Sequence, residues 1–460
     1  QPRAPRVLPM SASHLFAYSP EQLRGLAQQV LEIARARGAT DCAMEVSEGL
    51  GLSVSVRKGK VETIEQNRDK SVAVTTFIGQ RKGHASSSDF SPAAVEQTVQ
   101  AAIDIARYTA EDACAGLPDD DMIERAPRDL GLCTVWDIDA AAAVEIARRS
   151  EAAALAVDPR IRNSEGASVS AQHSHFVAAN SRGFIGGYPY SRHYISCAPI
   201  AQHKRDMQRD DWYSSARDPQ LLASPETIGR YAAERALARL GSRKISTRKC
   251  PVLFEAPLAC GLLGAFVQAT SGGALYRKSS FLVDSLGQRV FAAHISMIED
   301  PHVPGAMGSA PFDEEGVRTV RREVVKQGVV EGYFLSTYSA RKLGMKTTGN
   351  AGGSHNLALR SSQTTARDDF RAMLRKLGTG LLVTELMGQG VNYVSGDYSR
   401  GACGFWVENG VIVHPVEEIT IAGNLREMFK NIVAVGADTI VRGTKETGSI
   451  LIDGMTIAGA

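Results

Sequence analysis

Two groups of side chains in this sequence are of the types that bind metal ions. His173 and His175 are two residues apart, so on a β-strand they would share one face and could chelate a metal. The segment 294–302 also holds two histidines, a glutamate and an aspartate. No carboxylate or third histidine lies near the first pair in sequence, and the second group lies beside two prolines. We therefore interpret the first as ordinary strand histidines and the second as a solvated loop.

The stretch Lys249–Gly273 predicts a buried strand followed by a helix. Cys250–Phe254 is apolar and has Pro251 near its start, where a missing N–H does least harm to a strand. Through Ala256–Ala269 apolar residues recur at helical spacing, with a proline in the first turn. The glycines at 272–273 are expected to end this helix.

The first part of the chain predicts helices packed on an antiparallel sheet. Ser19-Pro20 and Ser91-Pro92 are typical helix starts. Between them, alternating apolar residues predict four strands from 42 to 78, with turns at 49–51, 58–60 and 79–80. The order of helix, meander and helix is an α+β pattern without βαβ alternation.

The second part of the chain is rich in glycine and in short apolar runs, which predicts a mainly antiparallel β domain. Few helix signals appear there beyond 256–269, 368–377 and 424–430. Asn409-Gly410 between two apolar runs predicts a hairpin with a type I′ turn. A basic, polar stretch at 241–249 separates the two parts. We expect a flexible arm at 1–20, an α+β domain at 21–241 and a β-rich domain at 249–460.

Length, charge balance, cysteine content and missing motifs argue against several classes of protein. At 460 residues the chain is too long for one ordinary core, and no apolar run approaches the roughly 20 residues of a membrane span. Lys plus Arg is 52 and Asp plus Glu is 50, which gives no electrostatic reason to bind nucleic acid. Seven scattered cysteines without a CxxC pair favour reduced thiols and a cytoplasmic location. Phosphate-binding loop, dinucleotide-binding and GxSxG motifs are absent from the sequence.

Three runs in the second half carry a family resemblance. They are YRKSS at 276–280 with DSLG at 284–287, GNAGGSHN at 349–356, and ELMGQG at 385–390 continuing through GDYSRG at 396–401 to FWVENG at 405–410. With these runs the C-terminal half resembles the TldD/TldE (PmbA) family. The N-terminal half is similar in a less specific way, for example at VRKGKVE, 56–62.

The resemblance implies that the metal site of the family is degenerate in this chain. The TldD branch carries HExxxH followed by GLEGDF, where the two histidines bind zinc and the glutamate activates water. Here GLLGAF occupies 261–266, which places Glu255 and Cys260 at the histidine positions and Ala256 at the base. The TldD branch also uses a cysteine near its C-terminus as third ligand, whereas the last cysteine here is Cys403. The chain thus resembles the TldE (PmbA) branch, and no bound metal is expected. In that interpretation the negative charge of Glu255 stabilises the N-terminus of the helix, and Cys260 is a small core residue.

The glycine-rich run from 388 onward is the candidate substrate site. In the family the substrate is an extended or unfolded polypeptide, and such a peptide can add as a strand to a sheet edge. The residues expected to line the groove are Gly388, Gly390, Asp397, Tyr398 and Arg400. The alternative is a turn stabilised by an Asp397–Arg400 contact.

Three hypotheses for function follow from the resemblance. The first is a non-catalytic subunit that forms a heterodimeric metalloprotease with a TldD-type partner, which holds the zinc. That pair would process peptide-antibiotic precursors and degrade antitoxins, the chain would dimerise through its C-terminal half, and a homodimer could form in isolation. The second is a metallopeptidase in its own right, against which Ala256 argues. The third is a protein-binding modulator of DNA gyrase.

Overall fold

The computed structural model describes residues 14–459, and these form two compact units. The first unit runs to Leu237 and includes the segments 304–307 and 316–318. The second unit comprises the remainder, from Ala238 onward. The first combines helices with an antiparallel sheet and the second is mainly β with few helices, which confirms the α+β fold class.

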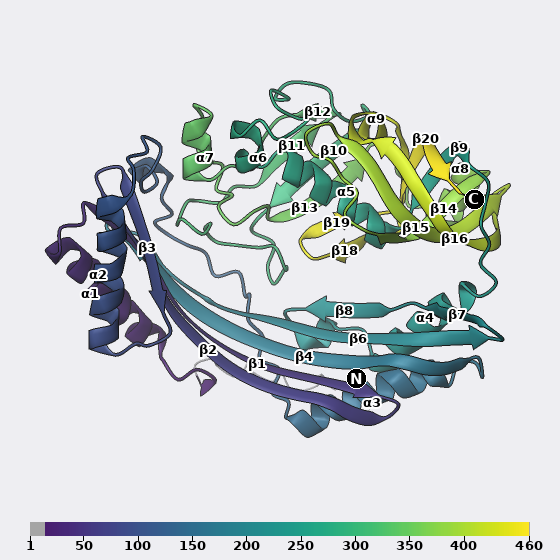
Figure 1. Cartoon of the computed structure of the whole chain (residues 1–460), viewed down its shortest axis with the longest axis horizontal. Coiled ribbons are helices and arrows are strands. Elements are labelled where there is room, and N and C mark those ends of the chain that lie inside the picture. Colours follow the sequence, from purple (N-terminus) through teal and green to yellow (C-terminus); the bar gives the residue numbers. More distant parts are fainter. Residues whose placement is uncertain (1–13, 460) are drawn as a thin grey trace, which may run out of the picture. The chain divides into compact units, whose positions relative to one another are not determined.

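The first unit is built on an eight-stranded sheet in the order β3-β2-β1-β4-β6-β7, with β5 paired to β4 and β8 paired to β6. Neighbouring strands are antiparallel. Its long central strands curve along their length (Figure 1). The strands are β1 (Asp41–Arg57), β2 (Lys60–Ile78), β3 (Arg81–Ser87), β4 (Ile161–Asn180), β5 (Ile185–Gly186), β6 (Pro189–His203), β7 (Asp206–Arg209) and β8 (Trp212–Ala216).

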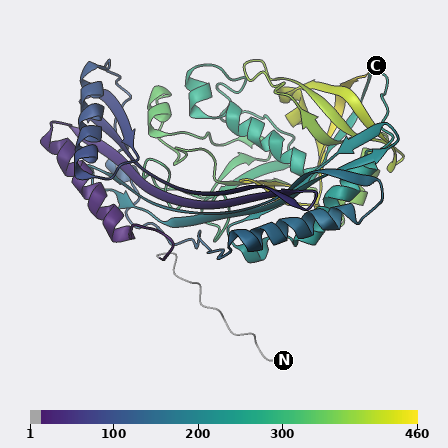
Figure 2. The same ribbon diagram turned by 60° about the horizontal axis from the view of Figure 1, so that its bottom comes forward.

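Helices cover this sheet because each has one apolar stripe to bury. α1 (Pro20–Ala36) packs on β1 and β4, and α2 (Pro92–Tyr108) packs on β2 and β3. α3 (Ala140–Leu155) runs along β1, β4 and β6 (Figure 2). α4 (Pro225–Ala238) and two short 3-10 segments, η2 (Asp120–Met122) and η3 (Pro219–Leu221), complete the unit. The predicted start of α1 is confirmed, since Ser19 and Gln22 form a capping box.

The turn predicted at 49–51 is wrong. β1 continues through this glycine pair, with Gly49 opposite Asp69 on β2 and opposite Ser174 on β4. A Cβ atom on Gly51 would lie 2.2 Å from the Gln172 side chain. Glycine is therefore required here by close packing between paired strands rather than by a change of chain direction.

Residues 1–13 of the expected arm lie outside the described residues. The part that follows contacts the sheet. The backbone N–H groups of Ala17 and Tyr18 donate to the Glu48 carboxylate, at 2.7 and 3.1 Å. The Phe16 ring stacks on His175 with centroids 3.9 Å apart.

The second unit contains two six-stranded sheets. The first has the order β16-β15-β14-β9-β20-β17, and an additional pairing of β16 with β20 closes five of its strands into a barrel. The second has the order β12-β11-β10-β13-β19-β18. Pairing is antiparallel except at β9–β14 and β13–β19.

The bounds of these elements follow chain order. The strands are β9 (Arg248–Phe254), β10 (Ile295–Asp300), β11 (Arg322–Lys326), β12 (Val329–Val330), β13 (Asn356–Ser361), β14 (Gly380–Met387), β15 (Asp397–Glu408), β16 (Val411–Asn424), β17 (Ile432–Val435), β18 (Ile440–Arg442), β19 (Lys445–Thr447) and β20 (Ile450–Ala458). The helices are α5 (Ala256–Ala269), α6 (Gly272–Tyr276), α7 (Thr337–Lys342), α8 (Phe370–Leu377) and α9 (Leu425–Lys430).

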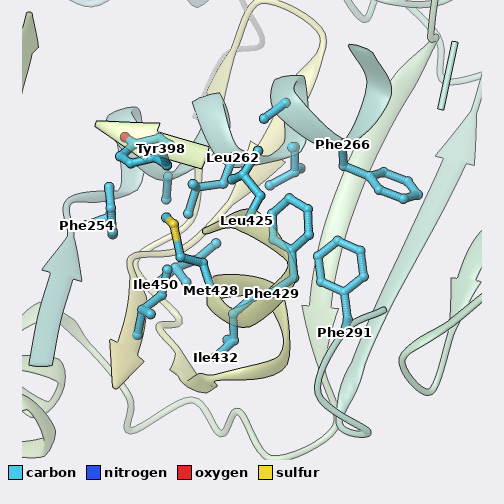
Figure 3. Packing of buried hydrophobic residues seen from close by; sticks show 14 of the residues in the cluster. Phe254, Leu262, Phe266, Phe291, Tyr398, Leu425, Met428, Phe429, Ile432 and Ile450 are labelled. Carbon is cyan, nitrogen blue, oxygen red and sulfur yellow. The ribbon is translucent and has the colours of Figure 1, made fainter. Parts of the chain in front are cut away.

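The core of the second unit forms around α5 and α9. Phe266 of α5, Phe291 and Phe429 of α9 are fully buried and meet ring to ring (Figure 3). The predicted hairpin between β15 and β16 is confirmed: Asn409 and Gly410 both have positive φ, at 52° and 77°, as a type I′ turn requires. The glycines at 272–273 begin α6 instead of only ending α5, which is a correction.

The solvated loop predicted at 294–302 is also wrong. Most of it is β10, which pairs with β11 and β13, and Glu299 is 1% exposed. Its carboxylate accepts hydrogen bonds from Arg322 Nε at 2.7 Å, Asn350 Nδ2 at 2.7 Å and the His355 N–H at 2.8 Å. The partners come from segments distant in sequence, so local polarity could not reveal this burial. Two of them belong to the glycine-rich run 349–356, which therefore has a structural role here.

Among residues 14–459, no helix is long and apolar enough to cross a membrane.

Candidate functional site

The start of α5 follows directly from the buried strand β9. Glu255 occupies the N-cap position, and its side chain makes no capping hydrogen bond there. Its backbone N–H donates to the Val383 carbonyl at 3.1 Å, which ties the helix start to β14. Ala256 is the next residue and is buried. One turn later Cys260 is buried as well, with Sγ close to the Lys445 carbonyl at 3.7 Å.

Burial decides the chemistry of Cys260. It raises the pKa of the Cys260 thiol to about 11, outweighing the neighbouring hydrogen bonds and the charges of Arg442 and Lys445, which lower it. The side chain is therefore a neutral thiol at physiological pH.

A pocket of about 120 Å³ lies beside the middle of α5. The helix contributes one wall, made of Leu258, Gly261, Leu262 and Ala265. Gly261 leaves space there, because a Cβ atom built on it meets nothing within 4 Å. Small residues at 261 and 265 of an otherwise apolar helix are the sequence signal for this wall, which was not predicted.

The opposite wall contains four of the five predicted substrate residues: Gly388, Gly390, Tyr398 and Arg400. The fifth, Asp397, does not line the pocket. It is exposed, and its carboxylate accepts hydrogen bonds from Ser395 Oγ at 2.7 Å and Asn424 Nδ2 at 3.0 Å. These two hydrogen bonds lower the pKa of Asp397. Within the described part of the chain no hydrogen bond or ion pair joins Asp397 to Arg400, so the alternative of a turn held by that pair is not supported.

Tyr398 and Arg400 bring polar groups to this space, which Gln389 and Tyr393 line as well. The Tyr398 side chain lies in the core cluster near Leu262 of α5 (Figure 3). Burial raises the pKa of Tyr398 to about 12, while the charge and a hydrogen bond of Arg400 lower it to a smaller extent. Within residues 14–459, Arg400 Nε is buried and has no hydrogen-bond partner.

The sequence predicts that a peptide adds as a strand along this run. However, both edges of β15 are already paired in this region. Asp397–Arg400 of β15 pairs with β16 on one side. On the other side the Ser399 N–H donates to the Gly390 carbonyl at 2.7 Å, and Val391 bridges to Tyr398. A Cβ atom on Gly390 would lie 1.4 Å from the Ser399 carbonyl oxygen, so glycine is needed for this close approach. A ligand of this site would enter the pocket and would not add to β15.

Most of the chain matches known proteins in sequence. Three models of the PmbA/TldA metallopeptidase match in sequence: domain 1 over residues 44–106, the central domain over 133–240 and the C-terminal domain over 247–459. The chain belongs to the PmbA/TldD family. A metalloprotease PmbA of Escherichia coli is 48% identical over 425 residues, covering 92% of this chain and 94% of that protein.

Further relatives agree with a place in the PmbA/TldE branch. A metalloprotease PmbA homologue of Haemophilus influenzae is 44% identical and covers 98% of this chain and 99% of its own length. A crystal structure from Bacteroides thetaiotaomicron, described as a proposed modulator of DNA gyrase, has a TM-score of 0.90 at 26% identity. It covers 96% of this chain and 100% of its own.

The family name implies a metal, and the residues at the family position do not fit a catalytic zinc. Such a site uses three protein ligands and a water. Here the ligand candidates are Glu255 and Cys260, and the second is a protonated, buried thiol. In residues 14–459 no group of three His, Cys, Asp or Glu side chains is arranged to hold a metal ion. Ala256 offers no atom that could accept a proton from water.

The two strand histidines, His173 and His175, also have hydrogen-bonding partners within the protein. His173 Nε2 accepts the Trp136 N–H at 3.0 Å, which places the ring proton of the neutral form on Nδ1 and leaves no lone pair for a metal. Burial lowers the pKa of His173 to about 4, with a smaller contribution from His193. His175 Nε2 lies 3.1 Å from Glu48 Oε2, so a carboxylate is close in space, contrary to the expectation from sequence proximity. Glu48 comes from β1, opposite His175 in the β1–β4 pairing.

Proposed function

We propose that this chain is a non-catalytic subunit that acts together with a TldD-type metallopeptidase. The observation that carries the proposal is the start of α5, where an alanine occupies the position of the general base and a buried thiol occupies a ligand position. Neither group can activate water at neutral pH. The PmbA/TldE branch supports this assignment, since the chain resembles its members along most of its length.

In this proposal the partner carries HExxxH and holds the zinc, while this chain contributes to binding an extended or unfolded peptide. Peptide-antibiotic precursors and antitoxins are the expected substrates. The pocket between α5 and the segment 388–400 is the proposed contact with substrate. The seven cysteines are all free and five of them are buried, which agrees with the proposed cytoplasmic location. We also propose a homodimer in isolation, through the C-terminal unit.

A second candidate, a metallopeptidase in its own right, is favoured by the name metalloprotease that the curated relatives carry. The two candidates differ in which chain must contain the catalytic residues. Under the first, the chemistry is lost when the HExxxH glutamate of the partner is replaced. Under the second, this chain alone is sufficient.

Reconstitution distinguishes them. The purified chain, a TldD-type partner and their mixture are assayed for cleavage of an unfolded protein such as casein. We expect cleavage only by the mixture, and loss of cleavage when the partner glutamate of HExxxH is changed to glutamine. The variants Glu255→Ala and Cys260→Ser of this chain should leave the activity of the mixture within about twofold, since neither residue is in the proposed chemistry. Cleavage by this chain alone, abolished by Glu255→Ala, would establish the second candidate.

A further inference from the structure

The pocket beside α5 combines a cation with apolar walls, and the proposed function does not explain the cation. No acidic side chain lines the pocket among the described residues. Glu385, the acidic residue of β14, forms an ion pair with Arg239, with Oε2 2.6 Å from Arg239 Nη1. Arg400 forms no ion pair within residues 14–459, and its Nε is buried without a hydrogen-bond partner.

The buried Nε–H group of Arg400 lacks a hydrogen-bond acceptor within residues 14–459. A buried N–H without an acceptor costs about 1–3 kcal/mol, and a guanidinium pairs with carboxylates through parallel hydrogen bonds. The Tyr398 hydroxyl is buried beside it and keeps its proton at all physiological pH values, because burial raises its pKa to about 12. Arg400 and Tyr398 together therefore present donors without a negatively charged partner of their own.

The other lining residues indicate which chemical groups of the ligand lie next to its negative charge. Leu258 and Leu262 of α5, together with Leu386 and Val391, give the pocket an apolar side, and Gln389 and Tyr393 add uncharged polar side chains. The volume of about 120 Å³ corresponds to room for roughly four water molecules, or a carboxylate with a few adjoining carbon atoms. Gly261 contributes no side chain to the wall and so leaves this room open.

We propose that the pocket binds a carboxylate group of the peptide substrate, with Arg400 and Tyr398 as its donors and α5 as the wall for the adjoining apolar atoms. Two sources of a carboxylate have this chemistry: the free C-terminus of a peptide ending in an apolar residue, and an acidic side chain. The inference rests on the proposed function in one respect, namely that the ligand is a peptide.

The test measures binding of fluorescein-labelled hexapeptides to the full chain by anisotropy at physiological salt. One pair, made of Gly and Ser with a final Leu, differs only in a free or an amidated C-terminus. A second pair, with both ends blocked, differs only in a central Glu or Gln. We expect the carboxylate form of at least one pair to bind about tenfold more tightly or better, as for a hydrogen bond to a charged group. The pair that shows the preference identifies the source. Equal binding within each pair, or no binding of any peptide, would overturn the proposal.

Variants locate the preference at this pocket. Arg400→Gln should reduce it to below about twofold and Arg400→Lys should keep part of it, because the charge remains. Arg367→Gln, which removes an exposed arginine of the same unit, is the matched control and should keep all of it. Gly261→Leu fills the space and should weaken the carboxylate form most. An undiminished preference in folded Arg400→Gln, and equally in Gly261→Leu, would contradict the assignment.

The outcomes separate this inference from the proposed function. If the mixture with a TldD-type partner cleaves casein but the chain shows no carboxylate preference, the inference alone fails. If the preference is present and depends on Arg400, but no cleavage requires this chain, the proposed function alone fails.

Discussion

Replacing Glu299 by alanine should destabilise the second unit more than any surface substitution nearby. The carboxylate is 1% exposed and accepts from Arg322, Asn350 and His355 at 2.7–2.8 Å. Its removal takes the carboxylate from the Arg322 cation and the acceptor from the His355 N–H, while Arg322 Nη2 keeps Asn350 Oδ1 at 2.9 Å and Asn350 Nδ2 keeps the Gly353 carbonyl at 3.1 Å. Breaking a buried pair from one side costs about 3–5 kcal/mol. Glu299→Gln retains an acceptor oxygen and should cost less, about 1–3 kcal/mol.

Hydrogen exchange read by mass spectrometry measures this effect where it arises. Peptides that cover β10 and β13 should exchange about 100-fold faster in Glu299→Ala, since about 3 kcal/mol corresponds to that factor. The exposed pair Arg360–Glu446 bridges the neighbouring strands β13 and β19 and provides the control. Glu446→Ala should change exchange by less than about fivefold, because surface ion pairs contribute about 1 kcal/mol or less. Equal exchange in the two variants would refute the argument that burial makes the Glu299 network strong.

Further predictions concern single positions. Gly261→Ala, in the interior of α5 with open space at its Cβ, should raise the stability by about 0.5–1 kcal/mol in thermal melts, whereas Gly272→Ala should lower it, since its Cβ would lie 2.0 Å from Ser339 Oγ. Cys260 should resist iodoacetamide at pH 7.5 in the folded chain, because its pKa is about 11; rapid labelling, seen by peptide mapping, would contradict its burial. The folded pKa of His173 is about 4 and the unfolded value is about 6.5, so the unfolded state binds more protons between these values and stability should fall as the pH drops from about 6.5 to 4. In His173→Asn the fall in melting temperature over this interval should be smaller; an unchanged fall would assign it to other groups.

Local signals in the sequence were sufficient for elements whose determinants lie within a few residues. The capping box at Ser19, the hairpin at Asn409-Gly410 and helix α5 from Ala256 to Ala269 were all predicted and are all present. Each depends on a cap, a positive φ or a helical apolar repeat that adjacent residues determine.

The predictions that failed depend on partners distant in the chain. Gly51 was predicted to be part of a turn. Glycine is needed there because the Gln172 side chain on the neighbouring strand leaves no space for a Cβ atom. Glu299 was taken for a loop residue, and its burial depends on Arg322 and Asn350. A local pattern of glycine or of charge has more than one tertiary explanation, and spacing alone does not choose between them.

The candidate site shows the same division. The family resemblance supplied Gly388, Gly390, Tyr398 and Arg400, and these four line one pocket. It also supplied Asp397, which faces away toward Ser395 and Asn424. The contribution of α5 to this pocket arises because the glycine-rich segment packs against the helix, and that packing was not predicted.

The zinc content of the purified chain, measured together with its peptidase activity, tests whether this chain carries a catalytic metal site. We expect less than about 0.1 zinc per chain after exposure to zinc and gel filtration, and no cleavage of casein until a TldD-type partner is added, because a catalytic site needs three protein ligands and residues 14–459 do not bring three together. Close to one zinc per chain, with cleavage by the chain alone that a chelator abolishes, would contradict it.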